Sequence, residues 1–198
     1  MKDLLKKHIM KYGQMDPEEI QTIIDEILVE SYDKGKILIE QGSVSDKCYF
    51  VLKGLVRQYG INMDGEEITY NFYSEEDAVV LFNQTNLGLP SLYTLECVED
   101  CVLVVGDLES EEKAYEKHED LQDVTMKMVE AMMGDLQDYH HRFMSSSPEQ
   151  RYLNLLDERP DLIDRVPQHQ IASYLGIKPE SLSRIKRRIQ KSKLKVVD

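Results

Sequence analysis

The feature that most restricts the possible folds is a change in sequence pattern along the chain. Residues 28–108 have the pattern of short β-strands, and the segments on either side have the pattern of helices. Within 28–108 the chain consists of short runs rich in β-branched and aromatic residues, namely KILIEQG, KCYFVLKGLVRQYGI, EITYNFY and TLECVEDCVLVV. Glycine-containing turn signals separate the runs, and Asp64-Gly65 is typical of a tight β-hairpin. Several short strands at this spacing predict a β-sandwich or barrel.

Helical periodicity appears on both sides of the β-rich region. Asp16-Pro17 predicts a helix start, with a carboxylate at the N-cap and proline in the first turn. A longer helix is predicted over 118–143, and at ~1.5 Å per residue it would be ~39 Å long. We expect its seam to pack partly on a partner helix in a homodimer, and packing wholly on its own β-domain is the alternative. The residues of the predicted interface are Leu121, Val124, Met128, Met132, Leu136 and Tyr139.

The segment 168–191, QHQIASYLGIKPESLSRIKRRIQK, has the residues that a helix-turn-helix requires. Ala172 is small enough for two helices to cross closely, and Gly176 tolerates the positive φ of a sharp turn. Proline at position 179 suits the first turn of the second helix. The apolar residues that would fill the angle between the helices are Ile171, Leu175, Ile177, Leu182 and Ile185.

The opposite face of that second helix is polar and basic. At ~100° per residue, Glu180, Ser183 and Arg184 lie away from the apolar side and would read base edges. Phosphate contacts are predicted for Gln168, His169, Lys178, Lys186, Arg187, Arg188 and Lys191, with Lys193 and Lys195 beyond them. The alternative is an ordinary solvated face on a small helical domain.

The net charge of −13 would disfavour DNA binding if it were spread evenly, but it is distributed unevenly along the chain. Residues 1–145 hold 13 lysines and arginines against 30 acidic residues, whereas residues 146–198 hold 11 against 7. Phosphate attraction depends on charge within about a Debye length, ~8 Å at physiological salt. A basic C-terminal segment can therefore bind DNA although the body is acidic.

This order of elements resembles the cyclic-AMP receptor and fumarate-nitrate regulator (Crp/Fnr) family of bacterial transcription factors. The resemblance rests on Glu180, Ser183 and Arg184, which match the E-x-x-S-R motif of the Fnr-like branch, and on a strand-turn-strand with Gly54 and Gly65. It implies an α+β fold with a cyclic-nucleotide-binding-like β-roll (jelly-roll) sensor domain over 1–117, a dimerisation helix and hinge over 118–146, and a helix-turn-helix domain over 147–198. The implied partners are a second copy of the chain, double-stranded palindromic DNA with TTGA-like half-sites, and RNA polymerase. Only KSKLKVVD follows the recognition helix, so the family's wing would be short or missing.

The sequence departs from the family's known sensors. The Gly-Glu pair and the arginine of the cyclic-AMP phosphate cassette are replaced by Val80-Leu81 and Ser91, and Arg57 is the only cation from 56 to 112. A buried cyclic phosphate would lack a cationic partner, so we expect no response to cyclic AMP and an unidentified small-molecule effector or none. Three cysteines cannot supply the four ligands of an iron-sulfur cluster, and no cofactor or metal is predicted.

Cys97 and Cys101 would lie on one side of a single strand, where buried packing is favoured over a redox pair.

Two other functions stay open. The first is a ligand-sensing module of the cyclic-nucleotide-binding type whose helical tail contacts proteins. The second is an enzyme on a cupin-like barrel, which is disfavoured because none of the five histidines lies within 28–108. Since no signal peptide or membrane-spanning run is apparent and the cysteines form no disulfide framework, we expect a cytoplasmic protein without enzymatic activity.

Overall fold

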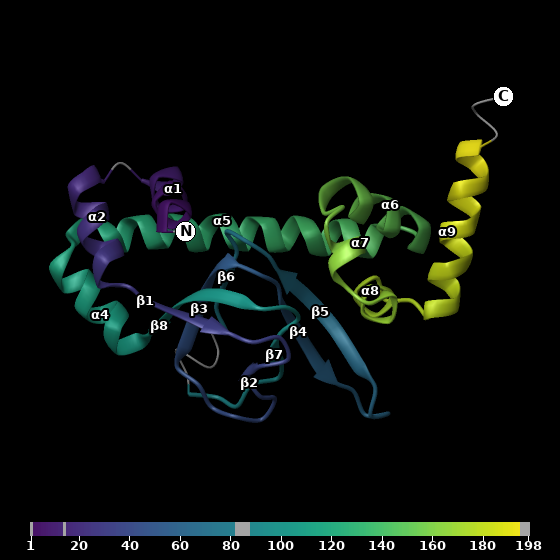
Figure 1. The fold of residues 1–198 in the computed structure, drawn as a ribbon, viewed down its shortest axis with the longest axis horizontal. Coiled ribbons are helices and arrows are strands. Elements are labelled where there is room, and N and C mark those ends of the chain that lie inside the picture. The colour runs from purple at the N-terminus through teal and green to yellow at the C-terminus, as the bar shows by residue number, and fades with distance from the viewer. Residues whose placement is uncertain (1, 14, 82–87, 195–198) are drawn as a thin grey trace. The chain divides into compact units, whose positions relative to one another are not determined.

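The structure is a computed structural model, and it describes residues 2–13, 15–81 and 88–194. The chain forms two compact units, one made of Met1–Gly60 and Asn71–Leu136, the other of Ile61–Tyr70 and Gln137–Asp198. Each unit combines segments that are distant in the sequence. The fold is mixed α+β, as the sequence predicts (Figure 1).

Two four-stranded antiparallel sheets form the β-roll. The first has the order β1-β8-β3-β6 and contains Leu28–Tyr32, Cys101–Asp107, Lys47–Lys53 and Ala78–Val79. The second has the order β2-β7-β4-β5 and contains Ile37–Ile39, Thr94–Cys97, Val56–Ile61 and Glu67–Tyr73. Strand β5 is at an edge of its sheet.

Apolar side chains of both sheets meet in one core, in which Val51, Leu95 and Leu103 are fully buried. The single strand predicted for Cys97 and Cys101 is wrong, because residues 98–100 leave the extended conformation and carry the chain from β7 to β8. Both thiols are free and buried in this core. Gly54, with φ +102°, lies so close to Cys101 that an added Cβ would be 2.7 Å from its Sγ.

The predicted β4–β5 hairpin is confirmed. Gly65 has φ +79°, and its amide donates to the carbonyl of Asn62 over 3.1 Å. The side-chain oxygen of Asn62 accepts from the amides of Asp64 and Glu66, each over 2.9 Å. The hydrogen bonds of the turn itself are thus made among residues 62–66.

Two N-terminal helices, α1 (Lys2–Tyr12) and α2 (Pro17–Glu26), share a core with Phe50, Leu52 and Val124. The predicted cap of α2 is confirmed, because Asp16 Oδ1 accepts from the amide of Glu18 over 2.8 Å. Helix α1 was not predicted.

Helix α4 (Leu108–Lys117) follows β8 directly. Asp107 caps it through the amide of Ser110 and pairs with Lys47 over 2.7 Å.

The long helix is α5 (Glu119–Ser145), close to its predicted range. After it come α6 (Pro148–Glu158), α7 (Leu162–Arg165), α8 (Gln168–Tyr174) and α9 (Pro179–Leu194). The predicted start of α6 is confirmed, since the Ser147 hydroxyl accepts from the amide of Gln150 over 3.2 Å. The buried residues of these helices include Tyr152, Leu155 and Leu162.

Candidate nucleic-acid interface

A tight turn joins α8 to α9. Gly176 takes φ +67°, its amide donates to Ser173 over 3.0 Å, and the amide of Ile177 donates to Ala172 over 2.9 Å. These bonds satisfy carbonyls that the end of α8 would otherwise leave open, and glycine adopts this conformation without strain. The turn thus forms from the residues that the sequence pattern selected.

The two helices pack through their predicted apolar residues. Ala172 is fully buried, and Ile171, Leu175, Leu182 and Ile185 are each at most 6% exposed. Because one side of α9 is fixed in this core, its opposite side faces away from the unit.

The three predicted base-reading residues share that outer face. Glu180 and Arg184 are exposed, and Ser183 is half-buried. The Ser183 hydroxyl donates to the carbonyl of Pro179 over 3.1 Å, and Arg184 Nη2 donates to Ser181 Oγ over 3.4 Å. Arg184 therefore lies along its own helix and can turn outward at the loss of one long hydrogen bond.

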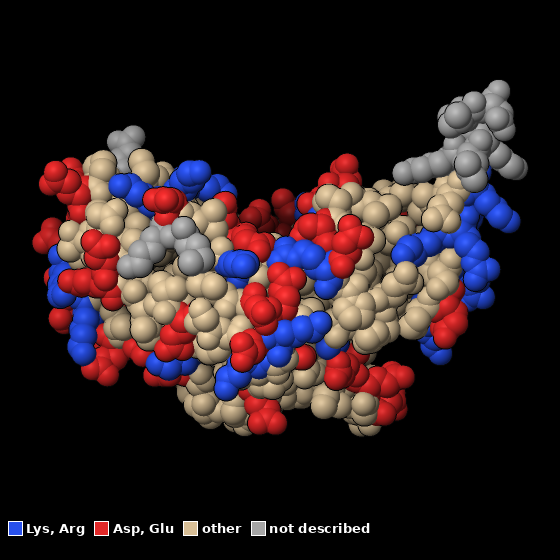
Figure 2. Space-filling view, viewed as in Figure 1, with Lys and Arg blue, Asp and Glu red and all other residues tan. Residues whose placement is uncertain are grey.

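Most of the predicted phosphate-binding residues are accessible. Gln168, His169, Lys178, Arg187 and Lys191 are exposed, and Lys186 is half-buried. Basic side chains gather along α9 in the space-filling view (Figure 2).

Arg188 differs from the others because it forms an ion pair with Glu149 of α6. The side chain of Lys193 and the whole of Lys195 lie outside the described residues.

Arg151 of α6 supports the turn, a role that could not be predicted from the sequence. Its Nε donates to the carbonyl of Phe143 over 3.1 Å and its Nη1 to the carbonyl of Leu175 over 3.0 Å. Its guanidinium lies 3.8 Å from the centre of the Phe143 ring. An arginine in an amphipathic helix gives no sequence signal for this role.

The predicted dimer seam has different surroundings along the length of α5. In the first unit, Val124 is 3% exposed and packs with α1 and α2, and Leu121 and Met128 lie against the same core. Met132 is half-buried. Leu136, by contrast, is 66% exposed.

Leu136 belongs to an outward stripe of α5 that also contains Met126, 54% exposed, and Met133, 58% exposed. These residues are spaced by seven and three positions, which places them on one side of a helix.

In the second unit, Tyr139 stacks on Tyr174 with ring centres 6.1 Å apart. Burial, the largest cause, raises the pKa of the Tyr139 hydroxyl well above its ordinary value.

Two polar side chains of the β-roll, Tyr73 and Ser91, form hydrogen bonds with other groups of the roll. The Tyr73 hydroxyl donates to Gln58 over 2.9 Å, and the Ser91 hydroxyl donates to the Tyr93 carbonyl over 2.6 Å. Arg57 on β4 is only 2% exposed and lies 4.3 Å from the Tyr59 ring centre. Arg57, the only lysine or arginine of residues 56–112, is thus an interior group. Val80 is half-buried and Leu81 is buried, and these are the two apolar residues predicted to replace the Gly-Glu pair.

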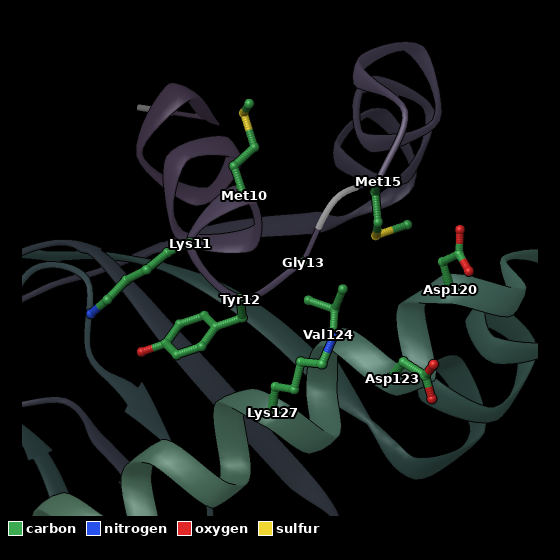
Figure 3. A pocket seen from close by; sticks show the side chains of 9 residues that line it. All are labelled: Met10, Lys11, Tyr12, Gly13, Met15, Asp120, Asp123, Val124 and Lys127. Atoms are coloured by element: carbon green, nitrogen blue, oxygen red, sulfur yellow. The ribbon is translucent and has the colours of Figure 1, made fainter.

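A surface hollow of about 610 Å³ lies between the α1–α2 connection and the first turns of α5 (Figure 3). Its charged groups, Lys11, Asp120, Asp123 and Lys127, are all exposed, and its floor is Val124. Exposed charges around an apolar floor do not fix the orientation of a ligand.

Among the described residues no group of three or more His, Cys, Asp or Glu side chains could hold a metal ion. No helix in residues 2–13, 15–81 and 88–194 is long and apolar enough to cross a membrane.

Comparison with known proteins supports the β-roll. Residues 29–118 match the family model of the cyclic nucleotide-binding domain. The potassium channel SKOR of Arabidopsis thaliana is 32% identical over 100 residues, a match that covers 47% of this chain and 11% of the channel. The chain therefore spans about a tenth of the channel's length, and this likeness concerns one domain.

Solved structures resemble more of the chain. FixK2 from Bradyrhizobium japonicum superposes with a TM-score of 0.67 at 21% identity, covering 84% of this chain and 85% of FixK2. CLP from Xanthomonas campestris, described as a c-di-GMP responsive global regulator, gives 0.69 at 14% identity, covering 90% and 94%. At these identities the likeness establishes a shared fold, a β-roll with C-terminal helices.

Proposed function

We propose that this chain is a homodimeric, sequence-specific DNA-binding transcription regulator of the Crp/Fnr type. The observation that carries the proposal is the position of Glu180, Ser183 and Arg184 on one outer face of α9, opposite the buried Leu182 and Ile185. A helix held by one side in a small helical domain can enter the major groove with the other side. The α8–α9 pair is then a DNA-binding helix-turn-helix.

The side chains on that face suit base recognition. Arg184 can donate two hydrogen bonds to guanine O6 and N7, Glu180 can accept from a cytosine amine, and Ser183 can accept or donate. Palindromic DNA with TTGA-like half-sites is the substrate that the E-x-x-S-R resemblance suggests.

Phosphates would be contacted by the basic and polar residues around this face. They are Gln168, His169, Lys178, Lys186, Arg187 and Lys191. Arg188 can contact a phosphate only if its ion pair with Glu149 breaks. Its contribution to DNA affinity therefore depends on whether the guanidinium binds the phosphate more strongly than the carboxylate.

We assign a sensor domain to residues 1–117, a dimerisation helix and hinge to 118–146, and the DNA-binding domain to 147–198. The exposed stripe of Met126, Met133 and Leu136 is the part of α5 that a second copy would cover. Leu121, Val124 and Met128 then support the helix from its inner side, and Met132 and Tyr139 border the stripe.

The sensor domain responds either to an unidentified small molecule other than cyclic AMP or to no effector. Ser91, at the position of the family's phosphate-binding arginine, is 3% exposed and uses its hydroxyl within its own loop. RNA polymerase is the expected protein partner of a regulator of this type.

Binding to DNA selected from a random pool tests the proposal. We expect a palindrome whose half-sites lie about one helical turn apart, because two-fold related helices enter successive grooves ~34 Å apart. Arg184→Ala should lose the sequence preference, at roughly 1 to 3 kcal/mol per half-site. Arg165→Ala, which changes an arginine paired with Asp161 in the same unit, is the matched control.

Equal discrimination by Arg184→Ala and wild type would show that another face reads DNA. Failure of the wild type to retain any DNA at low salt, together with tight binding of a cyclic nucleotide, would favour the alternative, a ligand-sensing module whose helical tail contacts proteins.

A further inference from the structure

We infer that the β4–β5 hairpin inhibits DNA binding by docking on α8 through Ser173, and that DNA must displace it. The inference rests on the proposed function, since it assigns a regulatory role to residues beside the proposed interface. Hairpin residues 61–70 and helix α8 belong to the same compact unit.

The contact consists of one hydroxyl that bonds two backbone groups of β5. Ser173 Oγ accepts from the amide of Thr69 over 2.9 Å and donates to the carbonyl of Glu67 over 3.1 Å. Residues two apart on a strand direct their backbone groups to the same side. The hydroxyl therefore takes the place of a neighbouring strand at the edge of the sheet, where backbone groups need a partner.

The docked side of α8 is also a side that DNA would approach. Ser173 and His169 are four residues apart and so lie on one face of the helix, with Cβ atoms ~5 to 6 Å apart. His169 is exposed near the start of α8 and is one of the proposed phosphate contacts. A phosphate strand at His169 would pass next to the hairpin.

The hairpin is unsuited to lie beside phosphates because it is acidic. Asp64, Glu66 and Glu67 are all exposed, and residues 58–112 contain no lysine or arginine that could offset them. Acidic side chains cover the end of this hairpin in the space-filling view (Figure 2). Like charges within a Debye length of ~8 Å repel, so the docked hairpin opposes DNA at the same face.

Ser173 contributes two hydrogen bonds to the docking from a half-buried hydroxyl, and Met63 at the hairpin tip is fully exposed. If the undocked state is populated at roughly a tenth, the apparent Kd for DNA is about tenfold weaker than the intrinsic one.

Ser173→Ala tests the inference, because it removes both hydrogen bonds while alanine stays favourable in a helix. We expect the variant to bind the selected palindrome about tenfold more tightly than wild type. Amide hydrogen exchange of Thr69 should accelerate in the variant without DNA, and this readout does not depend on the proposed function. Ser145→Ala is the matched control, since its hydroxyl bonds only carbonyls of its own helix, over 2.8 and 3.3 Å.

Faster Thr69 exchange with unchanged or weaker DNA binding would overturn the inhibitory role and leave the DNA-binding proposal standing. Unchanged exchange would show that the docking does not depend on Ser173 and would overturn the inference directly. Absence of DNA binding by wild type and by both variants would overturn the proposed function and, with it, the inhibition.

Discussion

Arg151 offers the sharpest test of how the α8–α9 turn is held. Its guanidinium joins two helix ends, because it donates to Phe143 near the end of α5 and to Leu175 at the end of α8. It also lies over the Phe143 ring. Replacement by alanine removes all three interactions and leaves two carbonyls without their charged donor.

The magnitude follows from these contacts. A hydrogen bond from a charged donor contributes about 1.5 to 3 kcal/mol, and the half-buried position of Arg151 favours the lower end. The cation–π contact adds about 0.5 to 1 kcal/mol. With two such hydrogen bonds, Arg151→Ala should therefore lower the free energy of unfolding of the helical unit by about 3.5 kcal/mol.

Urea denaturation followed by circular dichroism, together with hydrogen exchange of the α8 and α9 amides, measures this change. Arg142→Ala is the control, since the Arg142–Glu158 pair is 3.8 Å apart with both side chains nearly half exposed. Such a pair contributes less than about 1 kcal/mol. If Arg151→Ala were no more destabilising than Arg142→Ala, the carbonyl contacts would not hold the turn.

Two further predictions concern α5 and α4. Met133→Glu should shift the protein from dimer to monomer in analytical ultracentrifugation, because it puts a charge in the apolar stripe. Met63→Glu at the exposed hairpin tip is the control and should stay dimeric. If the Met133→Glu protein were still a dimer, the stripe would not be the dimer interface. Hydrogen bonds from Lys47 and Ser110 lower the pKa of Asp107 to about 2 from 3.8, so its ionised form stabilises the fold fully above about pH 4 and loses this effect as the pH falls towards 2. Asp107→Asn should cost up to ~1 kcal/mol at pH 6 and nearly nothing at pH 2 in thermal unfolding, and a difference that does not depend on pH would contradict this assignment.

The elements that local chemistry determines could be predicted from the sequence. The cap at Asp16, the turn at Gly65 and the positive φ at Gly176 each need only residues within a few positions. The outer face of α9 follows from the same logic, since Leu182 and Ile185 mark the buried side and leave Arg184 opposite.

Features that depend on partners distant in the sequence could not be predicted. Periodicity shows which residues of α5 share a face, but not that Val124 meets α1 and α2 while Leu136 stays exposed. A count of basic residues cannot show that Arg188 pairs with Glu149. The predicted buried packing of Cys97 and Cys101 is confirmed, but their spacing did not show that a turn of three residues places them on different sheets.

The contact between Ser173 and Thr69 also has a consequence for the order of folding, because it closes a loop of 104 residues. The entropy of closing a loop increases with its length, so local turns and helices form before this contact does. During synthesis, more than a hundred further residues must be added after the hairpin before Ser173 of α8 can contact it. Segments of low local stability open first, and a docking that weakens when the two hydrogen bonds of Ser173 are lost would be one of them.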